Sequence, residues 1–170
     1  MAVRFGVVGT GNIGSQHIQL LDSGKVTGAT LAATASRSTP DLVTGVPHFV
    51  DYRQMFSDAD INAVLIATPT MSHVEVAQAA LEHSFHVVME KPIAMSMLQA
   101  ETLLARVPDD LKFAVMLNQR FHPAYAKLKQ LLVDDAIGSL QRVSWTMTAW
   151  YRPDIYYQVS SWRGTWPGEG

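Results

Sequence analysis

Short apolar runs recur along the first 116 residues, and longer stretches of mixed polarity separate them. Unbroken apolar runs of about four to eight residues are typical of strands that are buried on both faces of a sheet. We therefore predict strands at residues 3–8, 30–35, 63–67, 86–89 and 112–116, and a weaker strand at 48–50.

The stretches between these runs have the features of helices. Residues 13–23 place apolar side chains at helical intervals, and residues 51–57 are predicted to form a shorter helix after the weak strand. Residues 72–75 (SHVE) and 96–99 (SMLQ) have the pattern of a capping box, in which a serine hydroxyl accepts a backbone N–H at the start of a helix. Two further helices are therefore predicted to begin at these serines.

Strands and helices alternate along the chain, and this order predicts an α/β fold. Strands that are joined by helices pair in parallel through right-handed crossovers, which gives a doubly wound parallel sheet of the Rossmann type. In such a sheet, ligands bind in a crevice outside the carboxyl ends of the strands. The loop that follows each predicted strand is therefore a candidate binding segment.

The first of these loops, GTGNIG, contains three glycines in the GxGxxG arrangement. Gly9 and Gly11 allow a tight turn and a close approach of backbone amides to a pyrophosphate, and Gly14 lets the helix pack against the strand. Asn12 and Ile13 supply the first helical N–H groups. A plain tight turn is the alternative. The position between a strand and a helix favours dinucleotide binding.

The loop after the second strand bears on the choice of nucleotide. An NAD site usually has a carboxylate about 20 residues after the glycines, whereas an arginine there accommodates the 2′-phosphate of NADP. This chain has Ser36, Arg37 and Ser38 at that point and no acidic residue. We predict NADP as the cofactor, with NAD as the alternative if Arg37 is only a solvated charge.

The third and fourth loops add candidates for the same crevice. Thr68 and Pro69 follow the strand at 63–67, and His73 begins the next helix, where it either lies beside the cofactor or is a surface residue. Glu90 and Lys91 end the strand at 86–89, at the mouth of the crevice. An ordinary surface salt bridge is the alternative for this charge pair.

Composition limits the class of protein. The 170 residues carry a net charge of −2, are 48% hydrophobic and include no cysteine. These values give no sign of a nucleic-acid or membrane partner, and the lack of cysteine excludes a disulfide framework and a thiolate metal site. No metal ligands are assigned, and we expect a cytoplasmic protein, because no signal peptide or membrane span is apparent.

Five motifs in order resemble the N-terminal half of the glucose-fructose oxidoreductase and inositol dehydrogenase (Gfo/Idh/MocA) family. They are GTGNIG, ATPTMSH, EKP, NQRF and WR, at residues 9–14, 67–73, 90–92, 118–121 and 162–163. The resemblance implies NAD(P)-dependent hydride transfer to or from a sugar, inositol or related polyol.

The resemblance also implies roles for individual residues. Glu90 would contact the nicotinamide ribose, and Lys91 would act as the catalytic residue that donates to the reacting substrate oxygen. A lysine can both orient such an oxygen and exchange a proton with it. Asn118 would contact the nicotinamide end and Arg120 the substrate, with loop and cap hydrogen bonds as the alternative. The resemblance adds Trp162 and Arg163 to the cofactor site.

The predicted domain organisation has two parts. Residues 1–120 form the dinucleotide-binding domain, and residues 121–170 form a linking helix and the first strand, at 141–150, of an incomplete α+β substrate domain. Members of the resembled family continue into a helix that bears an aspartate and a histidine, and into a large antiparallel sheet. We therefore expect a fragment of a homo-oligomeric enzyme, inactive as these 170 residues alone. A non-catalytic dinucleotide-binding module is the alternative.

Overall fold

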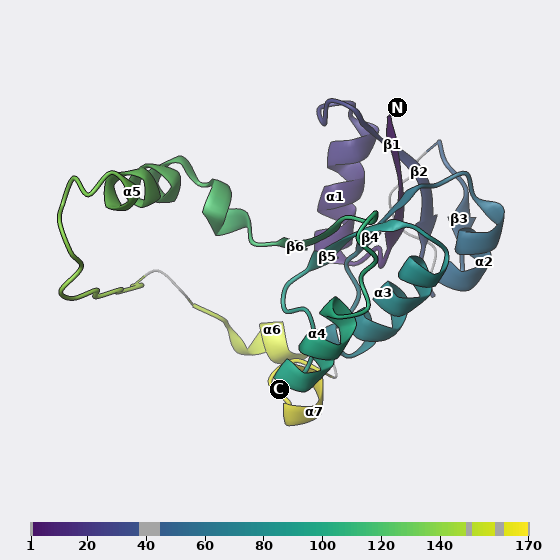
Figure 1. Cartoon of the computed structure of the whole chain (residues 1–170). Coiled ribbons are helices and arrows are strands. Elements are labelled where there is room, and N and C mark those ends of the chain that lie inside the picture. Colours follow the sequence, from purple (N-terminus) through teal and green to yellow (C-terminus); the bar gives the residue numbers. More distant parts are fainter. Residues whose placement is uncertain (1, 38–44, 149–150, 159–161, 170) are drawn as a thin grey trace. The chain divides into compact units, whose positions relative to one another are not determined.

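The computed structural model describes residues 2–37, 45–148, 151–158 and 162–169 (Figure 1). The chain divides into two compact units, one of residues 1–116 with 165–170, and one of residues 117–164. Ser38 lies outside the described residues, as do the last two residues of the strand predicted at 141–150.

The first unit is built on a six-stranded parallel sheet in the order β3-β2-β1-β4-β5-β6. The chain moves outward from β1 through β2 to β3 and then returns to the other side of β1 to form β4. This reversal is the topological switch of a doubly wound fold. The predicted fold class is confirmed, and each end of the six strands predicted within residues 3–116 is within one residue of the observed one. The strands are β1 (Val3–Val8), β2 (Ala29–Ala35), β3 (His48–Phe49), β4 (Ala63–Ile66), β5 (His86–Glu90) and β6 (Phe113–Met116).

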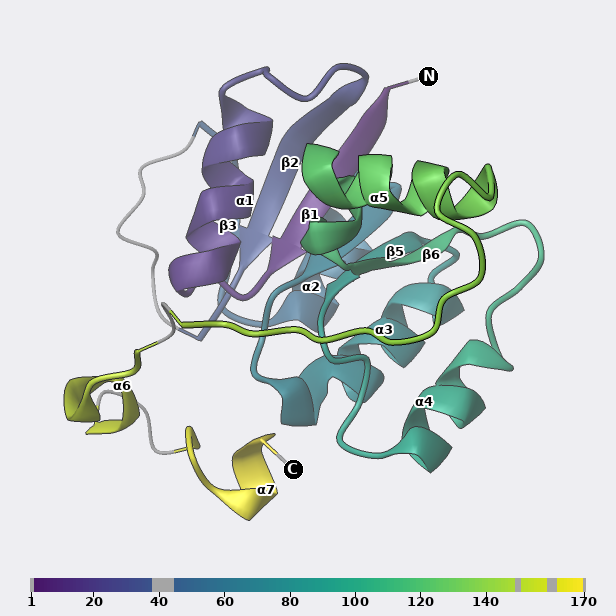
Figure 2. The same cartoon turned by 90° about the vertical axis from the view of Figure 1, so that its left-hand side faces the viewer.

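Helices cover both faces of this sheet. Helix α1 lies over one face, in front of the strands in Figure 2, and α2, α3 and α4 pack on the other (Figures 1 and 2). The helices of this unit are α1 (Asn12–Asp22), α2 (Tyr52–Asp58), η1 (Thr70–Ser72), α3 (His73–Glu82), α4 (Met97–Leu104) and α7 (Trp166–Glu169).

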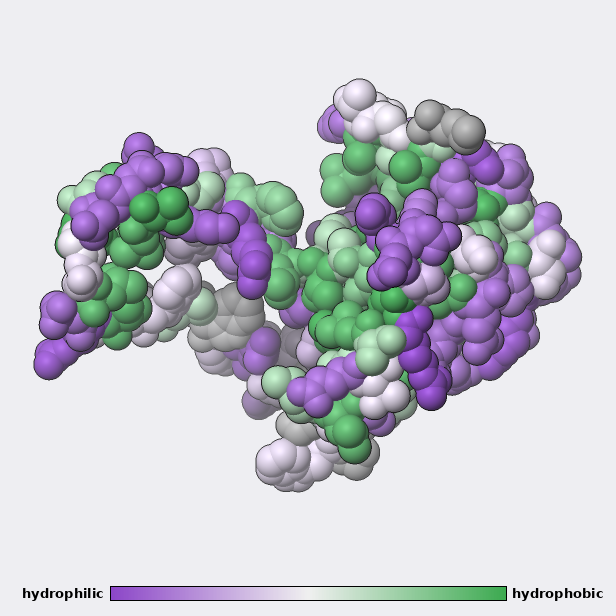
Figure 3. Space-filling model, in the orientation of Figure 1, coloured by the Kyte–Doolittle hydropathy of each residue, from purple (hydrophilic) through white to green (hydrophobic). Residues whose placement is uncertain are grey.

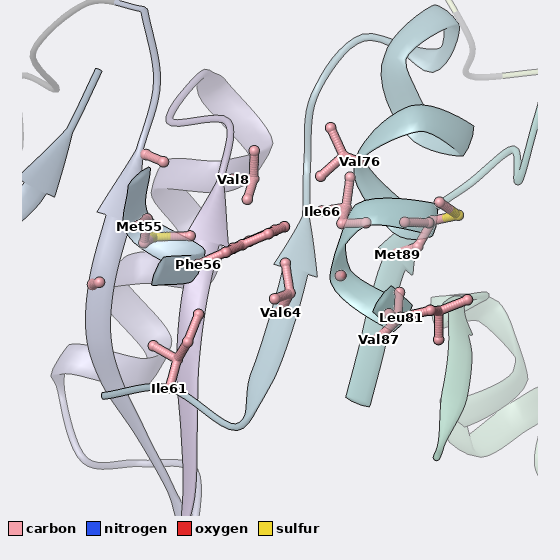
Figure 4. Packing of buried hydrophobic residues seen from close by; sticks show 14 of the residues in the cluster. Val8, Met55, Phe56, Ile61, Val64, Ile66, Val76, Leu81, Val87 and Met89 are labelled. Carbon is pink, nitrogen blue, oxygen red and sulfur yellow. The ribbon is translucent and has the colours of Figure 1, made fainter. Parts of the chain in front are cut away.

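Successive side chains of a strand point to opposite faces of the sheet, so the hydrophobic core has one layer on each face. Val7 is buried with Ile18 of α1, whereas its neighbour Val8 is buried with Phe56 and Val76 on the opposite face. Figure 4 shows Phe56 directed between Val8 and Val64. Because successive side chains of a strand point to opposite faces, an apolar run such as that of β1 supplies both layers at once.

Capping side chains begin the helices in different ways. The carboxylate of Asp51 accepts the N–H of Arg53 at 2.9 Å, and Ser96 Oγ accepts the N–H of Gln99 at 3.3 Å, as its capping box predicts. The capping box predicted at Ser72 is wrong. The turn η1 precedes α3 and directs the Ser72 hydroxyl backward, where it donates to the carbonyl of Pro69 at 2.9 Å.

Polar side chains join α2 to α3 at the surface, where hydrophilic residues gather (Figure 3). The hydroxyl of Tyr52 donates to Glu75 Oε1 at 2.9 Å, and Arg53 pairs with the same carboxylate. Burial, followed by the hydrogen bond to Glu75, raises the pKa of Tyr52 to about 12. This cluster joins the first turn of α2 to the first turn of α3 and serves the packing of the two helices.

The second unit contains η2 (Asn118–Phe121), α5 (Pro123–Val133) and α6 (Asp154–Gln158). Pro123 occupies the first turn of α5, and the His122 ring accepts the N–H of Ala124 at 3.3 Å. None of the residues described in this unit is buried. Hydrophobic side chains are therefore exposed here, including Phe121, Val143 and Tyr151.

The strand predicted at 141–150 is not formed in its described part. Residues 141–148 have no regular secondary structure, and Val143, Trp145 and Met147 are exposed. A strand needs a neighbour to pair with its N–H and C=O groups, and no described segment supplies one. An alternating apolar pattern alone does not form a strand.

No helix in the described part of the chain combines the length and the apolar character that crossing a membrane requires.

Two valines, one buried in the core and one exposed, allow the assigned core to be tested by stability measurements. Val64 is 0% exposed in the central strand β4, whereas Val50 is 67% exposed. Val64→Ala removes two buried methyl groups and should lower the free energy of unfolding by about 2 kcal/mol, whereas Val50→Ala should change it by less than about 0.5 kcal/mol. Urea unfolding of both variants measures the difference, and equal values would contradict the assigned core.

Candidate functional site

The register of the sheet brings four predicted loops to one level. Val8 of β1 pairs with Ala35 of β2 and with Ile66 of β4, and Ile66 pairs with Met89 of β5. The residues that follow these partners are Gly9, Ser36 and Ala67, which begin loops, and Glu90, which is the last residue of β5. The predicted candidates from all four loops therefore lie along one edge of the sheet, beside the switch point between β1 and β4.

The three glycines of the first loop meet different demands. Gly9 has a positive φ of 94°, and a Cβ there would lie 2.6 Å from the carbonyl oxygen of Ala67. A Cβ on Gly14 would overlap the carbonyl of Gly9, so the helix approaches the strand as closely as glycine allows. Gly11 faces open space, because no atom lies within 4 Å of the position that a Cβ would occupy there.

The start of α1 has the properties of an anion site. Gly11 is its N-cap and provides no capping side chain, and the first turn contains no acidic residue. Asn12 and Ile13 are exposed in that turn. Free N–H groups and the positive end of the helix dipole stabilise a phosphate at such a place. The open space at Gly11 lets a pyrophosphate approach, so these residues fit a dinucleotide.

The loops after β1 and β2 are joined by side chains. Thr10 Oγ1 and Ser36 Oγ lie 2.7 Å apart, and Ser15 Oγ donates to the carbonyl of Thr10 at 2.9 Å. Arg37 follows Ser36 and is exposed. Neither Ser36 nor Arg37 offers a carboxylate to the ribose hydroxyls of a nucleotide. The contact between Thr10 and Ser36 fixes the position from which Arg37 extends.

Thr68 leaves an unsatisfied polar atom in the loop after β4. Its Oγ1 is buried and has no hydrogen-bond partner in the described structure. Buried hydroxyls are normally paired, so an orphan hydroxyl next to a candidate binding site is a position where a ligand can supply the partner. Pro69 follows it with extended backbone and leads into η1.

His73 lies beneath two of the loops. It is only 1% exposed, which excludes the surface alternative. Nδ1 is 2.7 Å from the carbonyl oxygen of Pro92, and Nε2 is 2.9 Å from the carbonyl oxygen of Thr68. Both ring nitrogens are thus engaged with the main chain, one with the loop after β4 and one with the loop after β5.

Glu90 and Lys91, at the end of β5, do not form an ion pair with each other in the described structure. Glu90 Oε1 lies 2.9 Å from Nε2 of His17, with side chains that are 17% and 13% exposed, while Lys91 is exposed. The peptide bond between Lys91 and Pro92 is cis. The surface salt bridge considered as the alternative is therefore absent from the described ion pairs, and Lys91 is exposed after the end of β5.

His17 is a site residue that the sequence reasoning missed. It lies on α1, one turn after Gly14, so the i, i+3 spacing places it on the same side of the helix. This spacing could have indicated that His17 lies near the glycine loop. It could not have indicated the partner of His17, because Glu90 is 73 positions away along the chain.

The remaining candidates belong to the second unit. Asn118 and Arg120 lie in η2, where the N–H of Arg120 donates to the carbonyl of Leu117 at 2.9 Å. The guanidinium of Arg163 lies 4.3 Å from the ring centroid of Tyr156 and 5.5 Å from that of Trp162. These contacts describe the second unit by itself. Among the described residues of both units, no group of three His, Asp or Glu side chains is placed to hold a metal ion.

The fold and the glycine loop define a dinucleotide-binding protein of the Rossmann class. Residues 3–118 match the family model GFO_IDH_MocA, described as an oxidoreductase family with an NAD-binding Rossmann fold. This match covers well over half of the chain, and the chain belongs to that family.

Individual relatives agree with this assignment. The chain is 31% identical to an inositol 2-dehydrogenase of an Arthrobacter species over 81% of the chain and 43% of the relative. It is 26% identical to an uncharacterized oxidoreductase, YrbE, of Bacillus subtilis over 92% of the chain and 47% of the relative. The chain thus spans about half the length of the relatives it matches.

Solved structures show the same relation. The scyllo-inositol dehydrogenase of Lactobacillus casei with bound NAD(H) and scyllo-inositol matches with a TM-score of 0.75 and 31% identity, over 81% of this chain and 43% of that one. The WlbA dehydrogenase of Bordetella pertussis, in complex with NADH and UDP-GlcNAcA, matches with a TM-score of 0.86 and 25% identity, over 99% of this chain and 52% of that one.

Two glycine substitutions separate binding from folding. Gly11→Ala adds a methyl group in open space at a φ of −66°, so the free energy of unfolding should fall by no more than about 1 kcal/mol. The methyl group obstructs the pyrophosphate, so dinucleotide affinity should fall at least about tenfold, equivalent to 1.4 kcal/mol. Gly14→Ala should instead destabilise the fold. Calorimetric titration and urea unfolding measure both effects, and unchanged affinity in Gly11→Ala would contradict the assigned phosphate site.

Proposed function

We propose that these residues are the cofactor-binding half of an enzyme that transfers hydride between NAD(P) and a carbon of an inositol, sugar or related polyol. The observation that carries the proposal is Lys91, exposed at the end of β5 on the same edge of the sheet as the glycine loop. The inositol dehydrogenases among the relatives support the substrate class. The aspartate and histidine that the family resemblance implies would complete the catalytic group from the part that follows in longer relatives.

The residues divide the work along the crevice. Gly9, Gly11 and the first turn of α1 hold the pyrophosphate, and Glu90 accepts a hydrogen bond from the nicotinamide ribose. The bound nicotinamide supplies the hydride acceptor or donor. Lys91 donates a hydrogen bond to the reacting substrate oxygen and exchanges the proton that must leave or join it as a hydroxyl becomes a carbonyl or the reverse.

The two function classes differ in what they require of Lys91. A non-catalytic dinucleotide-binding module needs the glycine loop but has no use for an exposed ammonium at the nicotinamide end. An oxidoreductase needs both. We therefore favour the enzyme, and we propose that the 170 residues alone bind the cofactor without turnover. In the longer enzyme, the second domain would supply substrate contacts and a homo-oligomer interface.

The cofactor preference is proposed from the loop after β2. Arg37 can form bidentate, charge-assisted hydrogen bonds with the 2′-phosphate of NADP, and NAD has no such group. A fully formed contact of this kind contributes on the order of 1.5 to 3 kcal/mol, or roughly 10- to 150-fold in affinity. The scyllo-inositol dehydrogenase and WlbA structures contain NAD(H) and NADH, so NAD is the competing assignment.

Titration of the chain with both cofactors tests the proposal. NADPH should bind at least about tenfold more tightly than NADH, and Arg37→Ala should remove most of the difference while leaving NADH affinity nearly unchanged. Arg106→Ala, at an exposed arginine beyond α4, is the matched control and should change neither affinity. Equal affinities in the unmutated chain would assign NAD. Absence of saturable binding of either cofactor up to millimolar concentration would overturn the dinucleotide site itself.

Substitution of Lys91 tests the catalytic role in an enzyme that contains this half. Lys91→Ala should lower kcat by about 10²-fold or more, the usual scale for a positioned acid-base group, with little change in cofactor affinity. Lys127→Ala is the matched control, because Lys127 is an exposed lysine of α5. Steady-state kinetics with a panel of inositols and sugars gives the measurement. An unchanged kcat would leave Lys91 without a catalytic role.

A further inference from the structure

Lys91 lies between two residues that are each held by a histidine from another element. Glu90, which precedes it, contacts His17 of α1, and Pro92, which follows it, contacts His73 of α3. Neither histidine comes from β5. The side chain of Glu90 and the backbone carbonyl of Pro92, on either side of Lys91, are thus held by helices on opposite faces of the sheet.

The contact with His17 orients the carboxylate of Glu90 and leaves one of its two oxygens available to a ligand. Nε2 of His17 lies 2.9 Å from Oε1 of Glu90, and both side chains are largely removed from solvent. A carboxylate has two oxygens and about four acceptor positions, so a bond to Oε1 leaves Oε2 able to accept from a ribose hydroxyl. Because His17 belongs to the helix whose first turn faces the pyrophosphate, the contact joins the phosphate end of the site to the nicotinamide end.

The contact with His73 joins two loops through one ring. Its nitrogens lie 2.7 Å from the carbonyl oxygen of Pro92 and 2.9 Å from that of Thr68. Both partners are acceptors. A neutral imidazole has one N–H and can donate to one of them at a time, whereas the protonated ring can donate to both. In either form the ring fills the space between the loops that follow β4 and β5.

We propose that His17 and His73 form a histidine clamp that positions Glu90 and Lys91 for the nicotinamide end of the cofactor. Both are positioning residues, because they act through the segment between them. This inference rests on the proposed function. Its distinctive consequence is spatial, because loss of a clamp residue should weaken contacts at the nicotinamide end and leave the adenosine end unaffected.

Two pairs of ligands make that consequence measurable. NADPH is compared with 2′-phospho-ADP-ribose, and NADH with ADP-ribose, which lack the nicotinamide but keep the pyrophosphate and adenosine. His17→Leu and His73→Leu should each weaken binding of the reduced dinucleotide by about tenfold and change binding of its nicotinamide-free counterpart by less than about twofold. His83→Leu, at an exposed histidine at the end of the same helix α3, should change neither.

A conservative variant distinguishes a hydrogen bond from mere packing. The amide of glutamine can donate to Glu90 as Nε2 of histidine does, so His17→Gln should retain dinucleotide affinity within about threefold, equivalent to roughly 0.7 kcal/mol. Equal losses for both members of a ligand pair would overturn the proposal in favour of a general effect on the fold. Unchanged dinucleotide affinity in both leucine variants would also overturn it.

Hydrogen exchange tests the clamp independently of any ligand. In the cofactor-free chain, His73→Leu should increase amide exchange in the loop at 68–72 and in the segment 90–95 together, with β1 unchanged, whereas His83→Leu should affect neither loop. Faster exchange in both loops combined with no dinucleotide binding by the unmutated chain would support the clamp and refute the proposed function. Unchanged exchange in His73→Leu would refute the clamp. If His73→Leu does not fold, His73→Met, which also lacks a hydrogen-bond donor, is measured in its place, with the same two outcomes.

Discussion

The parallel pairing of Val8, Ile66 and Met89 is the constraint on which the site depends. Their strands β1, β4 and β5 end at one level, so the residues that follow emerge beside one another although they are far apart in sequence. Parallel strands require crossover helices, and these helices cover both faces of the sheet. Polar loops can therefore gather only at the strand ends. A glycine loop, an orphan threonine hydroxyl and an exposed lysine share that edge for this reason.

The close backbone contacts at Gly9 and Gly14 place the start of α1 next to the end of β1, where a ligand phosphate could bind. Without a Cβ on either residue, the backbone after β1 can turn within van der Waals distance of Ala67 and of α1. The helix then begins shortly beyond the strand, and its unpaired N–H groups lie beside the open space at Gly11. The same compact turn brings His17, one helical turn further on, within 2.9 Å of Glu90.

The sequence predicted the strands well because a run buried on both faces is a local signal. It predicted the glycine loop for the same reason, since the GxGxxG spacing between a strand and a helix is itself a local pattern. The site contacts between loops were harder, because the pairs Thr10 with Ser36 and His17 with Glu90 depend on sheet order and register. The strand expected at 141–150 did not form in its described part, because pairing needs a second segment. The Ser72 hydroxyl turned backward because η1 precedes its helix.

A lysine side chain is flexible, so holding its ammonium in one place is difficult, and the proposed clamp of His17 and His73 would limit this flexibility. Its four-carbon stem has about 2 kcal/mol of rotamer entropy, and the proposed reaction would require the ammonium to be held within a narrow range of the substrate oxygen. In the proposed clamp, His73 holds the backbone carbonyl of Pro92 directly after Lys91, which leaves the remaining freedom to the lysine side chain. Glu90 differs, because its own carboxylate is held at 2.9 Å by His17. A ribose contact would thus be set before the ligand arrives, while the reacting group settles only when the substrate is bound.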